Sequence, residues 1–194
     1  FLDVLALDAR RVIAVGAYGL CVVTTDGGQT WTPRKPLDDD CHFNRLSRGS
    51  TGKLYLAGER GTLLRSADDG ATWTPIRAPY EGSFYGILPL AEKTLLAYGL
   101  RGHVYRSTDD GATWSAIATP APVLLATAAQ PAPGTIVLAG HSRTLLVSRD
   151  DGQTFSAAPS PPASALARLL PLPDGKLLGL GEAGRVIIAL PTNP

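Results

Sequence analysis

The sequence predicts an all-β chain of the β-propeller class, and two recurring patterns carry that prediction. An eight-residue segment returns four times at a nearly constant interval, and a glycine-containing turn returns five times in register with it. The segments between these marks are short, bounded by glycine and rich in aliphatic or β-branched residues, as strands are. A repeat of about 40 residues with four short strands is typical of one propeller blade.

The eight-residue segment is an Asp-box, an aspartate-containing turn with a terminal aromatic residue. Residues 24–31 read TTDGGQTW, 66–73 read SADDGATW, 107–114 read STDDGATW and 148–155 read SRDDGQTF. The shared aspartates, Asp26, Asp68, Asp109 and Asp150, are 42, 41 and 41 residues apart. Four copies on one period predict tandem repeats of one structural unit.

The second mark adds a fifth repeat. Glycine opens a four-residue turn at Gly16, Gly58, Gly99, Gly140 and Gly181, and the last of these has no Asp-box after it. We therefore divide the chain into repeats at about 1–41, 42–82, 83–122, 123–163 and 164–194, within a single propeller domain or a fragment of one. The second repeat places its four strands at about 42–47, 53–58, 61–66 and 72–77.

The Asp-box is predicted to form the turn between the third and fourth strands of each blade. Its aspartate can accept backbone N–H groups, its glycine can adopt positive φ, and its aromatic ring can be buried between blades. The residues assigned to this structural role are Asp26, Gly28, Trp31, Asp68, Gly70, Trp73, Asp109, Gly111, Trp114, Asp150, Gly152 and Phe155.

The fifth repeat reaches its third strand near residues 184–190 and shows no fourth strand. Because unpaired strand edges promote aggregation, we expect this edge to be covered, either by residues upstream of Phe1 or by a second chain. The five visible repeats are thus predicted to belong to a larger, seven-bladed propeller, with the blade number taken from the resemblance below.

Charge and composition narrow the partner classes. Eighteen Lys and Arg residues nearly cancel 17 Asp and Glu residues, so no net field attracts nucleic acid. The longest apolar runs are far shorter than a membrane span, so direct membrane insertion is not expected. Cys21 and Cys41 permit one disulfide at most, and the sequence leaves open whether they are bridged or remain thiols.

These motifs, with the segment Leu54–Ser66 and the weaker marks at 79–83 and 99–103, resemble bacterial relatives of the photosystem II stability/assembly factor, a family of Asp-box propellers. The likeness covers nearly the whole chain. It implies a seven-bladed, exported or periplasmic protein that binds a protein partner, such as a membrane-protein complex, without catalysis or cofactor.

Asp-boxes also occur in sialidases and other glycoside hydrolases, so a carbohydrate-active propeller, either glycosidase or lectin-like, is the alternative. The Arg-Ile-Pro motif of sialidases is absent. Glu59 and Glu182 occupy equivalent turns, which favours a repeat feature over an acid and a nucleophile. The acidic segment Asp38–His42 is interpreted as an exposed turn, and no metal site is predicted.

Partner binding is predicted on the face formed by the turns between the second and third strands and by the loops between blades. Loops on a rigid scaffold commonly carry function, and arginine recognises carboxylates with its planar, forked guanidinium group. The partner-binding candidates on these turns are Tyr18, Arg60, Arg101, His141 and Arg143.

Overall fold

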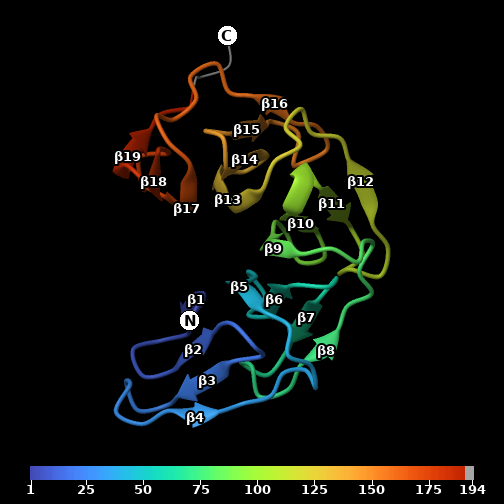
Figure 1. Ribbon diagram of the computed structural model, residues 1–194, viewed down its shortest axis with the longest axis vertical. Coiled ribbons are helices and arrows are strands. Elements are labelled where there is room, and N and C mark those ends of the chain that lie inside the picture. Colours follow the sequence, from blue (N-terminus) through green and yellow to red (C-terminus); the bar gives the residue numbers. More distant parts are fainter. Residues whose placement is uncertain (191–194) are drawn as a thin grey trace. The chain divides into compact units, whose positions relative to one another are not determined.

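The computed structural model of the chain describes residues 1–190, and nearly all of its regular structure is β-strand. Within these residues, nineteen strands form five antiparallel sheets, four of four strands and one of three. Each sheet follows the chain order without crossover, so every neighbouring pair of strands is joined by a turn or short loop. Figure 1 shows the sheets succeeding one another along the sequence.

The bounds of the elements follow the predicted repeats. The first sheet contains β1 (Asp3–Ala6), β2 (Val12–Val15), β3 (Cys21–Thr24) and β4 (Thr32–Pro33), and the second contains β5 (Phe43–Arg48), β6 (Leu54–Gly58), β7 (Leu63–Ser66) and β8 (Thr74–Pro75). The third contains β9 (Phe84–Pro89), β10 (Leu95–Gly99), β11 (Val104–Ser107) and β12 (Ser115–Ile117), with the short 3₁₀ turn η1 (Leu100–Gly102). The fourth contains β13 (Leu125–Ala132), β14 (Thr135–Gly140), β15 (Leu145–Ser148) and β16 (Ser156–Ala157), and the fifth contains β17 (Leu166–Pro171), β18 (Leu177–Gly181) and β19 (Gly184–Ile188).

The outermost strands are shorter than the sequence predicted. The fourth strand of the second repeat, expected over 72–77, is reduced to Thr74–Pro75 in β8. The Asp-box turn occupies the residues before Thr74, and one further backbone bond, from Ile76 N–H to Leu63 O (2.8 Å), follows Pro75. Within residues 1–190 the fifth sheet has three strands, as predicted, while the last four residues of that repeat, 191–194, lie outside the described part of the chain.

The chain divides into two compact units. One unit comprises residues 1–97 and 107–114, and the other comprises residues 98–106 and 115–194, so the division passes through the third sheet. In the first unit, apolar side chains of the first two sheets share one core, which includes Ile13, Val15, Leu46, Leu56 and Leu64. The second unit has a comparable core between the fourth and fifth sheets, built around Val137, Leu166 and Leu177.

Face-to-face packing of successive four-stranded antiparallel sheets is the blade architecture of a β-propeller. The middle strands explain why the sheets must stack, because β6 and β10 are buried along their whole length. A strand buried on both faces needs a neighbouring sheet on each side. The predicted fold class is therefore confirmed. The number of blades and the single-domain assignment stay predictions.

Candidate functional site

The Asp-boxes form closed hydrogen-bond networks at the turns between the third and fourth strands. In the second box, Thr72 donates to Asp68 from its backbone N–H (2.9 Å) and from its hydroxyl (2.6 Å). Ser66 donates its hydroxyl to the same carboxylate at 2.7 Å and accepts the N–H of Gly70 at 2.9 Å. These donors, the Thr72 hydroxyl foremost, lower the pKa of Asp68 to about 2.

The same pattern recurs in the other three boxes around Asp26, Asp109 and Asp150. The Thr113 hydroxyl likewise lowers the pKa of Asp109 to about 2. Because the carboxylate oxygens accept hydrogen bonds from donors in their own turns, these networks stabilise the local structure. The candidate binding residues therefore have to be sought elsewhere on the blades.

The glycines of the second and third boxes meet the preceding sheet. A Cβ atom on Gly70 would lie 2.6 Å from Cδ1 of Ile13 in the first sheet, and one on Gly111 would lie 2.5 Å from Cγ2 of Ile76 in the second. The ring of Trp114 also reaches back, since its Nε1 donates to the backbone carbonyl of Arg77 at 3.1 Å. The second and third boxes thus anchor their sheets to the ones before them.

Trp31 departs from the expectation that the box aromatic residue is buried. Its side chain is 44% exposed, whereas Trp73 packs against the shared core of the first two sheets. The physical reason is position, because no sheet of the described chain packs in front of the first one within its unit. Gly28 reflects the same situation, since a Cβ there would meet nothing closer than the Trp31 ring at 3.9 Å.

The second aspartate of the box bridges to the preceding sheet, a role that the sequence reasoning missed. Asp69 binds Arg11 of the first sheet at 2.6 Å. Asp110 receives Lys53 Nζ at 2.6 Å, Tyr55 Oη at 2.8 Å and Arg65 Nη1 at 3.0 Å from the second sheet.

The environment of Asp110 is partly desolvated, and its side chain is 12% exposed. Burial works to raise the pKa of Asp110, but the hydrogen bonds from Lys53 and Tyr55 and the charges of Lys53 and Arg65 outweigh it and lower that pKa. Burial, followed by the hydrogen bond to Asp110, raises the pKa of the Tyr55 hydroxyl. The contacts of Asp110 with Lys53, Tyr55 and Arg65 therefore connect the third sheet to the second.

The turns between the second and third strands carry the predicted binding residues in a strained conformation. Tyr18 and Gly19 both have positive φ (56° and 69°), as do Arg60 with Gly61 (52° and 71°) and Arg101 with Gly102 (57° and 72°). In the fourth sheet Ser142 and Arg143 occupy the same two positions (53° and 59°).

These are tight two-residue turns of the type I′ kind, closed by a backbone bond such as Leu20 N–H to Ala17 O (3.1 Å). Asn and Gly adopt positive φ with little strain, whereas the same conformation costs Tyr and Arg about 1 kcal/mol or more. The side chains of Tyr18, Arg60, Arg101, His141 and Arg143 are exposed. Strained, exposed, chemically capable side chains are typical of functional positions.

In the first unit these turns join the loop between the first two sheets to form a continuous rim. The N–H of Gly19 donates to Cys41 O and that of Glu59 to His42 O, at 2.9 and 3.0 Å. The Tyr18 and His42 rings meet edge to face with centroids 5.0 Å apart. His42 Nδ1 lies 3.4 Å from Glu59 Oε1.

The acidic segment of this loop pairs with cations of the chain. Asp39 binds Arg60 and Asp38 binds Lys35. In residues 1–190, no group of three or more His, Cys, Asp or Glu side chains has a geometry that could hold a metal ion. The segment thus orients Arg60 in the rim. That role was not anticipated from the sequence, which showed the run of aspartates but not its partners.

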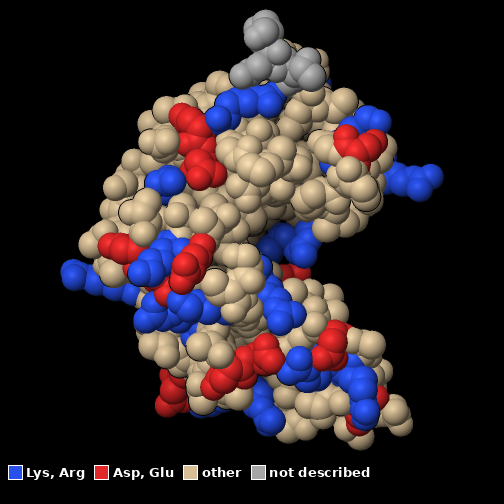
Figure 2. Space-filling model, turned by 180° about the vertical axis from the view of Figure 1, so that it is seen from behind, with Lys and Arg blue, Asp and Glu red and all other residues tan. Residues whose placement is uncertain are grey.

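In the second unit, the turn residues Arg101, His141 and Arg143 are held by equivalent bonds. Gly102 N–H donates to Val123 O at 2.6 Å, and His141 N–H donates to Leu124 O at 3.0 Å. The Arg143 guanidinium donates from Nε to Pro162 O at 2.8 Å. Figure 2 shows positive and negative side chains interspersed over parts of the visible face.

Both cysteines are buried thiols. Cys21 and Cys41 lie in the core shared by the first two sheets, and neither is in a disulfide. The Cys41 sulfur accepts a hydrogen bond from the Thr62 hydroxyl at 3.4 Å. Burial raises the pKa of the Cys21 thiol to about 11, with a small opposing contribution from the charge of Arg34. These thiols contribute to packing.

Comparisons with known proteins agree with this architecture. The family model described as Photosynthesis system II assembly factor YCF48 matches residues 1–125. The photosystem II assembly lipoproteins Ycf48 of Synechococcus sp. (strain CC9902) and Synechocystis sp. (strain ATCC 27184 / PCC 6803 / Kazusa) are 35% identical over 75 residues and 33% identical over 86 residues. These matches cover 38% and 43% of this chain, but only 22% and 25% of the two relatives.

Comparison with solved structures also indicates a fold like that of YCF48. A structure of YCF48 bound to D1 peptide matches with a TM-score of 0.71 and 25% identity, covering 92% of this chain and 59% of that one. YCF48 from Cyanidioschyzon merolae matches with a TM-score of 0.74 and 16% identity, covering 99% of this chain and 67% of that one. A GH74 enzyme from Niastella koreensis (TM-score 0.67, 22% identity, covering 92% and 27%) shares the fold alone. On the match over residues 1–125, the chain belongs to the Photosynthesis system II assembly factor YCF48 family.

Proposed function

We propose that this chain is a non-catalytic, protein-binding propeller that acts as an assembly factor and holds an extended segment of a partner protein on its rim. The observation that carries the proposal is the strained conformation of Tyr18 and Arg60 in the first unit, each exposed at positive φ where glycine or asparagine would cost less. Such strain persists where the side chain itself is needed.

The rim chemistry suits a peptide with carboxylate groups. Arg60 offers a forked guanidinium already oriented by Asp39, and the neighbouring Tyr18 and His42 rings offer an apolar and polar surface beside it. The YCF48 structure solved with a D1 peptide supports a polypeptide ligand for this family. We extend that class of ligand, a segment of a membrane-protein complex, to this chain.

The names of two relatives bear on where this chain acts. The two cyanobacterial relatives are named lipoproteins, which supports an exported or periplasmic place of action for this chain. Within residues 1–190, no helix combines the length and apolar character that crossing a membrane requires. The proposed partner is accordingly reached from the aqueous side of a membrane.

The carbohydrate-active alternative receives support from the fold only, through the GH74 neighbours. Of its candidate carboxylates, Glu59 accepts the His42 N–H at 3.2 Å and faces the His42 ring. That environment gives Glu59 a role in shaping the rim. A panel of fluorogenic glycosides and a glycan array test the alternative, and hydrolysis or glycan binding would favour it over the assembly-factor proposal.

The direct test measures binding of a fluorescently labelled D1 peptide by anisotropy. Arg60→Glu should weaken binding at least tenfold, because a charge-assisted contact becomes repulsive. Arg10→Glu is the matched control, since Arg10 is exposed in the turn between β1 and β2, at the other end of β2 from Tyr18. Equal affinity of the Arg60→Glu variant and the control would refute the proposal.

A further inference from the structure

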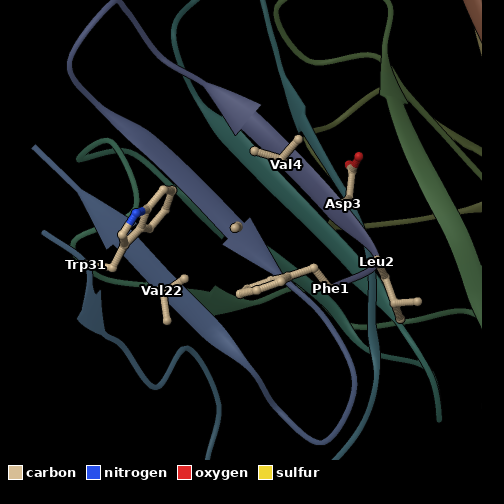
Figure 3. Close-up of a pocket in the computed structure, with 7 residues that line it drawn as sticks. Phe1, Leu2, Asp3, Val4, Val22 and Trp31 are labelled. Atoms are coloured by element: carbon tan, nitrogen blue, oxygen red, sulfur yellow. The ribbon is translucent and has the colours of Figure 1, made fainter. Parts of the chain in front are cut away.

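A small pocket lies between the first and second sheets, on the face of the first sheet that turns toward the second. Figure 3 shows the other face of the first sheet, where Val22 lies between the rings of Phe1 and Trp31. Because neighbouring side chains of a strand point to opposite faces, Val23 turns the other way and packs against the core shared with the second sheet. Val23 also lines the pocket, which has a volume of about 200 Å³. All the lining residues belong to the first unit.

The repeat shows which kind of residue normally occupies this place. Arg34 and Ile76 are equivalent, because each donates its backbone N–H to the carbonyl of the first residue of the third strand of its sheet, at 2.9 and 2.8 Å. The counterparts in the third and fourth sheets are Ile117 and Ala158. Arg34 is therefore a charged residue at a position that is apolar in the three following sheets.

Between the second and third sheets, Ile76 fills the equivalent space. Its side chain is 7% exposed, and its Cγ2 atom lies 2.5 Å from the position that a Cβ on Gly111 would take. Arg34 is exposed instead, since a guanidinium buried without a partner would lose its hydration. In the first sheet Ile13 fills part of the space, against Gly70, and the pocket is the part that remains.

The indole of Trp73 shows independently that this junction is less completely matched than the next one. In the third box, Trp114 Nε1 donates to the carbonyl of Arg77, the residue after Ile76. Within residues 1–190, the buried Nε1 of Trp73 has no hydrogen-bond partner. The Trp73 ring borders the pocket wall, because its Cζ2 atom lies 3.5 Å from the position of a Cβ on Gly70. Buried polar groups are normally paired, so this donor distinguishes the junction.

The lining combines aliphatic walls with one cation that has donors to spare. The aliphatic side chains are Leu7, Val12, Ile13 and Val23. Of the two arginines that line the pocket, Arg11 is bound by Asp8 and Asp69 at 2.7 and 2.6 Å. Among the described residues, the guanidinium of Arg34 has one hydrogen bond, from Nη1 to the carbonyl of Pro33 at 3.3 Å. A guanidinium with donors to spare recognises a carboxylate.

We propose that this pocket binds a small aliphatic carboxylate. Its branched hydrocarbon end takes the place that Ile76 fills at the next junction, and its carboxylate pairs with Arg34. Asp68 lies on the wall formed by the second sheet and repels a carboxylate, which directs the charged end toward Arg34. The ligand is small, because pockets for drug-sized molecules begin at roughly 300 Å³. The pocket lies at the other end of β2 from Tyr18, so it is a site separate from the rim.

NMR titration of the purified chain with 4-methylpentanoate tests the proposal. Acetate lacks the branched hydrocarbon and 4-methylpentanamide lacks the charge, so each should bind at least tenfold more weakly. The indole N–H resonance of Trp73, identified by its loss in Trp73→Phe, should shift on binding because its ring borders the pocket. The indole resonance of Trp114 should not shift. Equal affinity for all three compounds, or equal shifts of both indoles, would overturn the proposal.

Two substitutions of Arg34 separate the charge from the space. Arg34→Gln removes the charge, so it should weaken binding at least tenfold and leave the melting temperature unchanged. Arg34→Ile should fill the pocket as Ile76 does, which abolishes binding and raises the melting temperature by roughly 2–4 °C. Arg77→Gln removes an exposed arginine at the neighbouring junction and is the matched control, with binding like that of the unaltered chain. Undiminished binding by Arg34→Ile would contradict the assigned site.

Two sources supply a ligand of this chemistry, a free branched carboxylic acid and the C-terminal leucine of a polypeptide. N-acetyl-leucine represents the second, since it carries the same isobutyl group and carboxylate beside a peptide bond. Tighter binding of N-acetyl-leucine than of 4-methylpentanoate assigns the site to a chain end, and the reverse order assigns it to a free acid. If neither compound binds while the labelled peptide still binds the rim, the pocket proposal fails and the proposed function stands.

Discussion

Gly70 lies against Ile13 so closely that a Cβ atom at Gly70 would be 2.6 Å from the Ile13 Cδ1 atom. The Asp-box of the second sheet thus sits directly on the middle strand of the first. Glycine is required at this position for two reasons. Its φ is +85°, which other residues rarely adopt, and the contact with Ile13 leaves no space for a side chain.

Replacing Gly70 by alanine should destabilise the protein by roughly 2–4 kcal/mol, since strain at positive φ adds to overpacking against Ile13. Gly28→Ala provides the matched comparison, because its φ is +91° but its nearest neighbour is the Trp31 ring at 3.9 Å. That variant should lose only about 1–2 kcal/mol. Chemical denaturation measures both, and equal losses would show that the contact with Ile13 carries no weight.

The bridge made by Asp110 should be worth more than the one made by Asp69. Asp110→Ala leaves Lys53 and the Tyr55 hydroxyl without their acceptor in a partly buried site, at a cost of about 1–3 kcal/mol. The Asp69 side chain is 38% exposed, so Asp69→Ala should cost less than about 1 kcal/mol. The ranking is read from urea unfolding, and a reversed order would count against a structural role for the buried cluster.

Acid should weaken the Asp-boxes within a defined range of pH. Asp68 and Asp109 have pKa values of about 2 in the folded protein against a usual 3.8, so their stabilising effect is complete above about pH 4. It is lost as the pH falls through 2, because the unfolded chain takes up protons first. Thermal melting between pH 5 and pH 2 should show this decline.

The double variant Asp68→Asn with Asp109→Asn serves as the comparison for the acid effect. It should melt at a lower temperature than the unaltered protein at neutral pH, yet lose less on acidification. An unchanged slope of melting temperature against pH would mean that other carboxylates control the acid response.

Neither cysteine should react in the native protein. Cys21 and Cys41 are buried, and a Cys21 pKa of about 11 leaves almost no thiolate at neutral pH. Treatment with iodoacetamide followed by mass spectrometry should show no label until denaturant is added, and then two labels. Native labelling would indicate local opening of the core between the first two sheets.

The sequence predicted the blades because each blade repeats the same local chemistry. The Asp-box positions at Asp26, Asp68, Asp109 and Asp150 fixed the turns, and the strands followed from the short runs between glycines. The outer strands were overestimated, since β4 and β8 span two residues each, as does β16, which contains no proline. Local patterns of this kind depend on neighbours in the chain, which a sequence displays.

Contacts between blades were harder to foresee. The sequence showed the second aspartate of each box but not that Asp110 would meet Lys53 and Tyr55, 55 or more residues away. The exposure of Trp31 was likewise missed, because its sequence surroundings match those of Trp73. The strain at Tyr18 and Arg60 had a visible signal, since a two-residue hairpin turn ending in glycine favours asparagine before it.

The central claim is that the strained rim side chains are retained for binding, and Arg60→Asn tests it most directly. Asparagine tolerates positive φ, so the variant should gain up to about 1 kcal/mol of stability while it loses the guanidinium. Thermal melting and anisotropy with the same labelled peptide measure both effects on one sample. We predict a higher melting temperature together with binding at least fivefold weaker. Unchanged binding, with or without the gain in stability, would contradict the account.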